Sequence, residues 1–134
     1  MNAVLVDSSV VLDIFTSDPK FYDRSLACLA LYGARGDLII NDIVYAEVSA
    51  GFSRIEELDI ALSGAGFRGS VIPKEAFFLA GKAFLAYKKR GGTRTSPLPD
   101  FIIGAHAAIV GIPLLTRNPS RIRDAYPQLW ILEP

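Results

Sequence analysis

Four short apolar runs, each followed at once by polar residues, are the feature that most limits what this chain can fold into. They lie far apart in the sequence, and segments with helix signals separate them. Short buried strands that alternate with helices are typical of a parallel sheet with helices on both faces. The pattern predicts strands at residues 3–6, 38–40, 113–116 and 129–132.

Helix signals fill the spaces between these runs. Ser8 or Ser9, Asp18 and Asp42 are of types that cap helix N-termini, and glycines follow several of the expected helices. These signals predict helices at residues 10–15, 19–32, 43–54, 55–63, 74–89 and 98–110, an edge strand at 70–72 and a polar loop at 91–97.

The length of 134 residues, without a linker, repeat or low-complexity tract, predicts a single domain over residues 1–134. The predicted class is α/β, with three layers in which helices flank a short, mainly parallel central sheet. An α+β domain with an antiparallel edge is the alternative.

Composition excludes several classes of protein. The chain is 51% hydrophobic, which is enough for a core, and its formal net charge of +0 excludes a strongly basic nucleic-acid binder. The single cysteine, Cys28, allows no internal disulfide and no cysteine metal site, and it fits a reducing cytoplasm. The N-terminal apolar run stops at Asp7, and no run is long enough to cross a bilayer. We therefore expect a cytoplasmic protein with no signal peptide and no membrane partner.

Oxygen-bearing side chains follow three of the predicted strands. Asp7 ends the first strand, Asn41 and Asp42 end the second, and Thr116 and Asn118 lie at the end of the third. Ligands of parallel sheets bind beyond the carboxyl ends of the strands, so these side chains mark a candidate site. None of the three segments is a glycine-rich phosphate cradle.

Two further acids, Glu47 and Asp100, interrupt apolar helical stretches, where we expect buried surroundings. A buried carboxylate is costly unless it is paired or bound to a metal. Each acid also has a structural explanation, because Asp7 and Asp100 could cap helices and Glu47 could reach Arg54. Taken together, Asp7, Glu47 and Asp100 predict an oxygen-only site, which suits Mg²⁺ or Mn²⁺.

The remaining titratable residues have simpler interpretations. Asp13 is expected to be a polar residue that supports the site, and Asp124 to be exposed. His106 is six positions after Asp100, roughly 120° away around a helix, so we expect a packed or surface histidine and no Ser–His–Asp set. Basic residues form two clusters that could hold phosphates or could simply be solvated: Lys88, Lys89, Arg90 and Arg94, and then Arg117, Arg121 and Arg123.

Four segments, in this order, resemble a PIN domain, specifically the VapC-type toxins of bacterial and archaeal toxin–antitoxin pairs. They span essentially the whole chain: residues 4–10 (VLVDSSV), 41–48 (NDIVYAEV), 98–107 (LPDFIIGAHA) and 114–119 (LLTRNP).

The resemblance implies a Mg²⁺- or Mn²⁺-dependent endoribonuclease, a hydrolase that cuts RNA as the toxin of a type II toxin–antitoxin system. It implies metal ligands at Asp7, Glu47 and Asp100, and we expect Thr116 and Asn118 to orient water or ligand. Asn118 stands where a fourth acid is common, so a second metal would be held less well. The resemblance also implies a homodimer and a cognate antitoxin protein that occupies the active-site groove.

Asn118 also motivates the main alternative, a non-catalytic or weakly catalytic PIN-like interaction module. A phosphate-accepting receiver domain would need an acidic pair near the first strand and a lysine after a late strand. An aspartyl phosphatase would need Asp-x-Asp, which Ser9 interrupts, and no nucleotide-binding P-loop is present.

Overall fold

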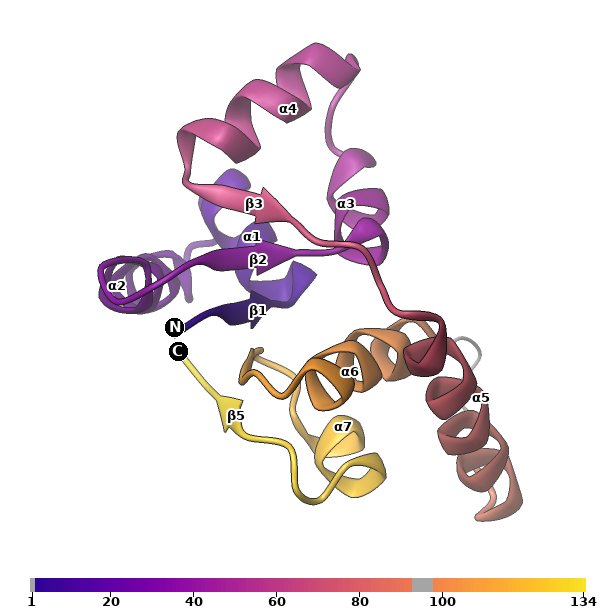
Figure 1. Ribbon diagram of the computed structural model, residues 1–134. Helices are drawn as coiled ribbons and strands as arrows, with labels where there is room; N and C mark the ends of the chain where they lie inside the picture. The colour runs from indigo at the N-terminus through magenta and orange to yellow at the C-terminus, as the bar shows by residue number, and fades with distance from the viewer. Residues whose placement is uncertain (1, 93–97) are drawn as a thin grey trace.

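A fully parallel sheet forms the frame of the computed structural model, which describes residues 2–92 and 98–134. Within these residues the sheet has five strands in the order β3-β2-β1-β4-β5. The strands are β1 (Val4–Val6), β2 (Leu38–Ile40), β3 (Phe67–Gly69), β4 (Leu114–Leu115) and β5 (Ile131–Leu132) (Figure 1). This topology confirms the predicted α/β class, and no antiparallel pair occurs in the described part of the chain.

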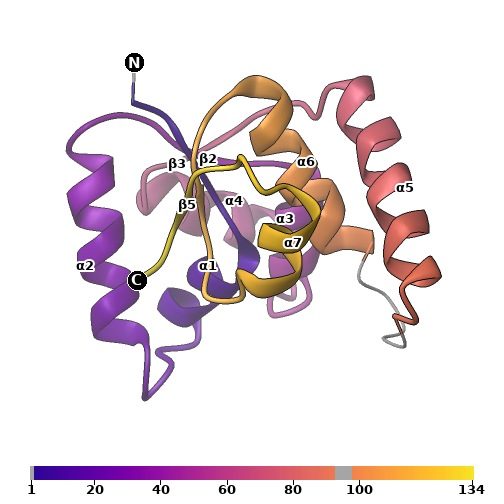
Figure 2. The ribbon, with the colours of Figure 1, turned by 90° about the horizontal axis from the view of Figure 1, so that it is seen from below.

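Helices on both faces of the sheet complete a three-layer fold. Figure 2 shows α1 and α2 on one side of the strands and α5 and α6 on the other. The helices of the described residues are α1 (Ser8–Phe15), α2 (Tyr22–Gly33), α3 (Asp42–Ser49), α4 (Ile55–Gly64), α5 (Lys74–Lys89), α6 (Leu98–Val110) and α7 (Ser120–Ala125).

The core lies around β1, the central strand. Leu5 and Val6 have no exposed surface, and neither do Val10 and Val11 of α1 or Phe101 of α6. Full burial of such a side chain stabilises the fold by about 1.5–3 kcal/mol. Asp7, which directly follows β1, is therefore attached to a tightly packed part of the core.

Three helix starts differ from the sequence prediction. The N-cap of α1 is Asp7 rather than a serine, because its carbonyl accepts the N–H groups of Val10 and Val11. The predicted helix at 19–32 begins only at Tyr22, because Asp18 Oδ1 accepts the N–H groups of residues 20 and 21 and forms a turn. The cap of α3 is Asn41 rather than Asp42, with Asn41 Oδ1 accepting the Val44 N–H at 3.0 Å.

Other boundaries also differ. α3 ends at Ser49 and not at residue 54, because the Gly51 N–H turns back to the Val48 carbonyl. The edge strand lies at Phe67–Gly69 rather than 70–72, since Phe67 pairs with Leu38 and the ladder ends at Ser70. β4 and β5 are shorter than predicted. The helix α7 was not predicted, because six residues are too few for a periodic signal.

Several predictions are confirmed as they stand. β2, α5 and α6 have the predicted bounds, and α4 extends one residue further. Residues 93–97 of the predicted loop lie outside the described residues, and so does Arg94. No helix in the described ranges has both the length and the hydropathy needed to cross a bilayer.

Candidate functional site

The carboxyl ends of three adjacent strands bring the predicted site residues together. β1 lies between β2 and β4 in the sheet. Asp7 follows β1, Asn41 follows β2 and Thr116 follows β4. The Asp7 N–H donates to the Leu115 carbonyl at 2.9 Å, which ties the end of β1 to the end of β4.

Asp7 is buried, with 5% of its surface exposed. Its Oδ2 accepts hydrogen bonds from Thr116 Oγ1 and Ser9 Oγ, both at 2.8 Å. Asp7 is the N-cap of α1, as the structural explanation predicts, but its side chain makes no capping bond, so capping does not account for the buried carboxylate. Its second oxygen, Oδ1, has no donor among the residues that the structure describes, so one lone-pair face of the carboxylate is available for a ligand.

Glu47 lies on the outer face of α3 and is exposed, which corrects the expectation of buried surroundings. Val44 and Val48 take the buried face of this helix. The pairing with Arg54 is also wrong, because Arg54 contacts Glu56 at 3.4 Å. Glu47 Oε1 instead accepts a hydrogen bond from Ser8 Oγ at 2.8 Å.

The acids Asp7 and Asp100 act on Glu47 through their charge. Desolvation by the surrounding protein is the largest cause of a raised pKa at Glu47, and the negative charges of Asp7 and Asp100 raise that pKa further. The hydrogen bond from Ser8 opposes this shift. The charges of Asp7 and Asp100 thus act on Glu47, and the hydrogen bond from Ser8 ties Glu47 to the first turn of α1, next to Asp7.

Asp100 reaches the site from the first turn of α6. It is not the cap of that helix, because α6 already begins at Leu98. Its Oδ2 accepts a hydrogen bond from Arg121 Nη2 at 2.8 Å, and both side chains are about one-third exposed (33% and 28%). Arg121 belongs to α7, so the missed helix brings a cation to the site.

Thr116 and Asn118 follow β4. Thr116 is fully buried, donates to Asp7, and accepts the Asn118 N–H on the same hydroxyl at 3.0 Å. The Asn118 side chain is exposed, and its amide has no hydrogen-bond partner within the described ranges. Thr116 therefore orients Asp7, whereas the Asn118 side chain is available to a ligand or to water.

Ser8 and Ser9 are the site residues that the sequence prediction assigned wrongly. They were expected to cap a helix, yet their hydroxyls donate to Glu47 and Asp7. Their position in the sequence could have indicated this role, since Ser8 and Ser9 come directly after Asp7 and lie on the first turn of α1.

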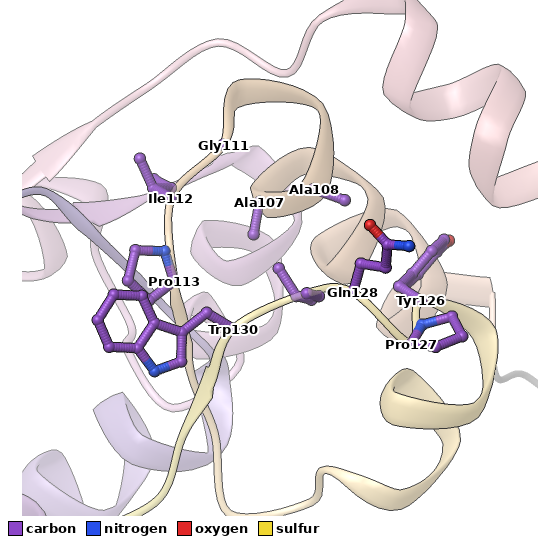
Figure 3. Close-up of a pocket in the computed structure, with 10 residues that line it drawn as sticks. Ala107, Ala108, Gly111, Ile112, Pro113, Tyr126, Pro127, Gln128 and Trp130 are labelled. Carbon is purple, nitrogen blue, oxygen red and sulfur yellow. The ribbon is translucent and has the colours of Figure 1, made fainter.

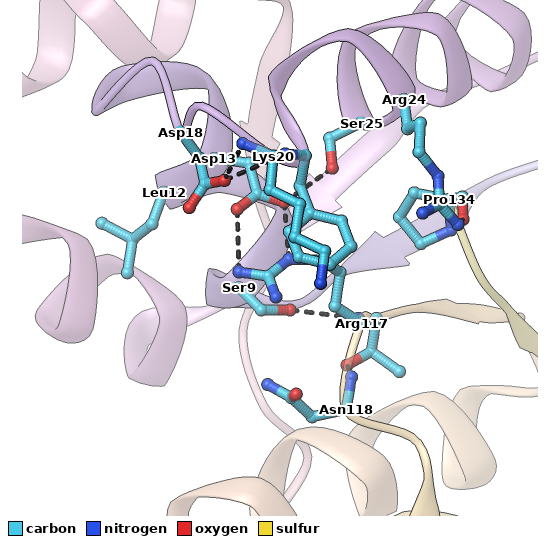
Figure 4. Close-up of polar contacts among 12 residues, drawn as sticks. Ser9, Leu12, Asp13, Asp18, Lys20, Arg24, Ser25, Arg117, Asn118 and Pro134 are labelled. Atoms are coloured by element: carbon cyan, nitrogen blue, oxygen red, sulfur yellow. Dashed lines mark hydrogen bonds and ion pairs between the residues drawn. The ribbon is translucent and has the colours of Figure 1, made fainter.

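A second polar cluster lies beside the site and contains Asp13, as Figure 4 shows. Asp13 is buried and forms two hydrogen bonds with Arg117, Nε to Oδ2 at 2.7 Å and Nη2 to Oδ1 at 2.8 Å. Ser25 Oγ also donates to Asp13, and the guanidinium lies 4.1 Å from the centre of the Phe21 ring. The Arg117 N–H donates to Ser9 Oγ at 3.2 Å, which connects the cluster to the site. Asp13 thus supports the site through Arg117.

The basic residues of the two predicted clusters have different surroundings in the structure. Arg117 is paired with Asp13, and Arg123 contacts Glu133 at 3.2 Å. Arg121 alone among these three arginines is hydrogen-bonded to one of the three site acids. Three members of the other cluster are exposed at the end of α5: Lys88, Lys89 and Arg90.

His106 is packed in the core, with 1% of its surface exposed, and desolvation lowers its pKa. Asn41 Oδ1 is occupied by the Val44 N–H, so Asn41 Nδ2 faces the ring and donates to His106 Nδ1 at 3.0 Å. The Nδ1 atom is therefore unprotonated. With Nδ1 engaged in this bond and the ring buried, His106 is part of the scaffold.

The donor chemistry of the site fits a hard divalent cation. Among the described residues, no three Asp, Glu, His or Cys side chains are placed to enclose a metal ion. Mg²⁺ commonly binds through one or two carboxylates and keeps several waters, so a closed cage is not required. The residues present supply carboxylate oxygens from Asp7, Glu47 and Asp100, together with the amide oxygen of Asn118.

A cavity of about 420 Å³ lies at the amino-terminal ends of the strands, opposite the candidate site, beside the residues that precede β4 and β5 (Figure 3). Pro113 and Trp130 form part of its wall, and no acidic or basic side chain lines it. No carboxylate or histidine is present to bind a metal ion there, and the candidate site remains at the carboxyl ends of the strands.

Solved structures with the same fold cover nearly the whole chain. VapBC from Salmonella typhimurium, bound to DNA, has a TM-score of 0.72 and 17% identity over 99% of this chain and 98% of its own. VapBC-1 from nontypeable Haemophilus influenzae has a TM-score of 0.71 and 18% identity over 98% and 97%. VapBC2 from Rickettsia felis, bound to a promoter DNA fragment, has a TM-score of 0.69 and 20% identity over 98% of each chain.

No curated protein matches the sequence significantly. The PIN domain family, in contrast, matches residues 4–126, which include β1 and all the candidate site residues. The match agrees with the parallel sheet and with the acids at its carboxyl edge. The chain belongs to the PIN domain family.

Proposed function

We propose that this protein is a Mg²⁺- or Mn²⁺-dependent endoribonuclease that acts as the toxin of a type II toxin–antitoxin system. The observation that supports the proposal is geometric: Asp7 follows β1 and is bonded to Thr116 beyond β4, and Ser8 beside Asp7 donates to Glu47 of α3. The raised pKa of Glu47, to which the charges of Asp7 and Asp100 contribute, is consistent with acids gathered at this end of the sheet. Such a cluster of like charges is costly unless a cation binds it.

Each residue has a defined task in this proposal. Asp7 and Asp100 would hold the ion, with Asp7 oriented by the hydroxyls of Thr116 and Ser9. Glu47 would hold a water molecule or a second ion, and Asn118 would orient water or ligand. The bound ion supplies Lewis acidity, which lowers the pKa of water and offsets the charge on the phosphate. No histidine is required, in agreement with the buried position of His106.

The proposed substrate is RNA that is unpaired at the cut site, because single-stranded segments expose their backbone and bases. The proposed partners are a cognate antitoxin and a second copy of the chain in a homodimer, in the cytoplasm. Support for the antitoxin comes from structural neighbours that are VapBC complexes or a toxin–antitoxin complex. Support for the homodimer comes from the family resemblance.

Cleavage by the purified protein tests the proposal. Labelled single-stranded RNA, its duplex, and single-stranded DNA of the same sequence are incubated with Mg²⁺, Mn²⁺ or EDTA. We expect products from single-stranded RNA only, and only when a divalent ion is present. A preparation that cleaves none of several unrelated RNAs with either ion would contradict the proposal and favour a non-catalytic interaction module.

A further inference from the structure

Arg121 occupies a specific position in the candidate site. Its Nη2 lies 2.8 Å from Asp100 Oδ2, one of the oxygens that the proposed function assigns to a metal ion. The pair is about one-third exposed, so solvent and ligands have access to both groups. The site thus contains a positive group of the protein's own beside one of its three acids.

The contact of Arg121 differs from that of the neighbouring Arg117. Arg117 binds both oxygens of the buried Asp13 and also lies against an aromatic ring. Between Arg121 and Asp100 there is one hydrogen bond in a part-buried position, and Arg121 extends from a helix of six residues. One hydrogen bond to a partly solvated carboxylate holds a guanidinium less firmly than two bonds to a buried one, so the contact of Arg121 is the more readily replaced. Of the two arginines, Arg121 is therefore the one that can change its partner.

We propose that Arg121 is an internal counter-ion of the site, which a divalent cation displaces from Asp100 and which then binds a phosphate of the RNA. This inference rests on the proposed function. A guanidinium near a bound dication repels it, so the two compete for the same carboxylate. Once it has left Asp100, a guanidinium suits phosphate, because its N–H groups match the phosphate oxygens in a bidentate contact. The same residue would thus couple metal binding to RNA binding.

The first test measures Mn²⁺ binding by isothermal titration calorimetry, without RNA. Arg121→Gln removes the competing charge, so we expect Mn²⁺ to bind roughly 3–10-fold more tightly. Arg121→Lys keeps the charge and should stay near the parent value. Arg123→Gln, on the same helix but paired with Glu133, is the matched control and should change nothing. Circular dichroism of each variant verifies the fold.

The second test measures RNA binding at saturating Mn²⁺ in an Asp7→Asn background, which slows cleavage. Adding Arg121→Gln should weaken the binding of a short single-stranded RNA roughly 3–10-fold and should lower the dependence of affinity on salt by about one phosphate contact. Adding Arg123→Gln instead should leave both quantities unchanged.

The outcomes separate this inference from the proposed function. If the parent binds Mn²⁺ clearly and Arg121→Gln binds it equally or more weakly, the cation does not displace Arg121 from Asp100. That result overturns the inference but not the proposed metal site. Unchanged RNA binding on addition of Arg121→Gln overturns the phosphate contact. If neither the parent nor any Arg121 variant binds Mn²⁺, the proposed metal-dependent function itself fails, and the exchange fails with it.

Discussion

Asn41 and His106 form a buried hydrogen bond of 3.0 Å that joins α3 to α6, the helices that carry Glu47 and Asp100. The same Asn41 side chain caps α3 by accepting the Val44 N–H. One amide thus fixes both the start of a helix and its connection to the neighbouring helix. This bond is one of the contacts that hold these two helices together.

His106→Leu should destabilise the protein by about 1–3 kcal/mol, because the buried Asn41 Nδ2 would lose its acceptor. His106→Gln offers a carbonyl oxygen as a replacement acceptor and should retain part of this free energy. Urea denaturation of the two variants and the parent measures the free energies of unfolding. Equal stability of the leucine variant and the parent would show that the link contributes nothing.

His106 should also make stability depend on pH. Its pKa lies below 6.5 in the folded protein because the ring is desolvated, whereas the unfolded chain titrates near 6.5. As the pH falls through about 6.5, the unfolded state therefore takes up the proton first, and the free energy of unfolding decreases until the folded pKa is passed. This contribution is complete above about pH 6.5 and is lost below it.

Melting temperatures of the parent and of His106→Gln between about pH 7.5 and 5.5 measure this effect. The parent should lose stability more steeply as the pH falls. Glu47, whose pKa is raised above 4.5, acts in the opposite direction at lower pH and should contribute equally in both proteins. Parallel curves for the two proteins would contradict the assignment to His106.

Arg117→Gln should cost about 2–4 kcal/mol of stability, because it leaves the buried carboxylate of Asp13 without its counter-ion. Arg123→Gln breaks an exposed ion pair and should change the free energy of unfolding by no more than about 0.5 kcal/mol. Chemical denaturation of both variants makes the comparison. Similar small losses in both would mean that the Asp13 pair has no special structural role.

Asn118→Asp should strengthen metal binding and lower the Mn²⁺ concentration needed for cleavage, because a carboxylate holds a hard cation better than a neutral amide does. The added charge should also lower the stability of the metal-free protein. The competing account is that the Asn118 amide donates to a carboxylate or to the phosphate. No carboxylate among the described residues accepts a hydrogen bond from that amide, which favours the first account. A loss of activity that saturating Mn²⁺ cannot restore would support the competing account.

The part of the site that follows strand ends could be predicted from sequence. The short apolar runs predict a parallel sheet, and the carboxyl ends of parallel strands share one edge, so Asp7 and Thr116 were expected to meet. Glu47 was misplaced because its apolar neighbours suggested burial, whereas the buried residues of α3 are Val44 and Val48. Sequence could not choose between Asn41 and Asp42 as cap, since both are capping types.

The pairing of the arginines could not be predicted. Arg117 meets Asp13 across 104 positions of the chain, and Arg121 meets Asp100 from a helix too short for a periodic signal. Both contacts depend on the tertiary fold rather than on local pattern. The cluster of Arg117, Arg121 and Arg123 that is visible in the sequence therefore consists of three separate ion pairs in the structure.

The most direct test of the central claim compares Mn²⁺-dependent cleavage of single-stranded RNA by the parent, Asp7→Asn, Asp100→Asn and the control Asp124→Asn, an exposed acid outside the site. The amide oxygen of Asn at position 7 can still accept from Thr116 and Ser9, so the fold should persist. We predict that both site variants lose roughly 100-fold or more of the cleavage rate while the control keeps the parent rate. Parent-like cleavage by folded Asp7→Asn or Asp100→Asn would contradict the account.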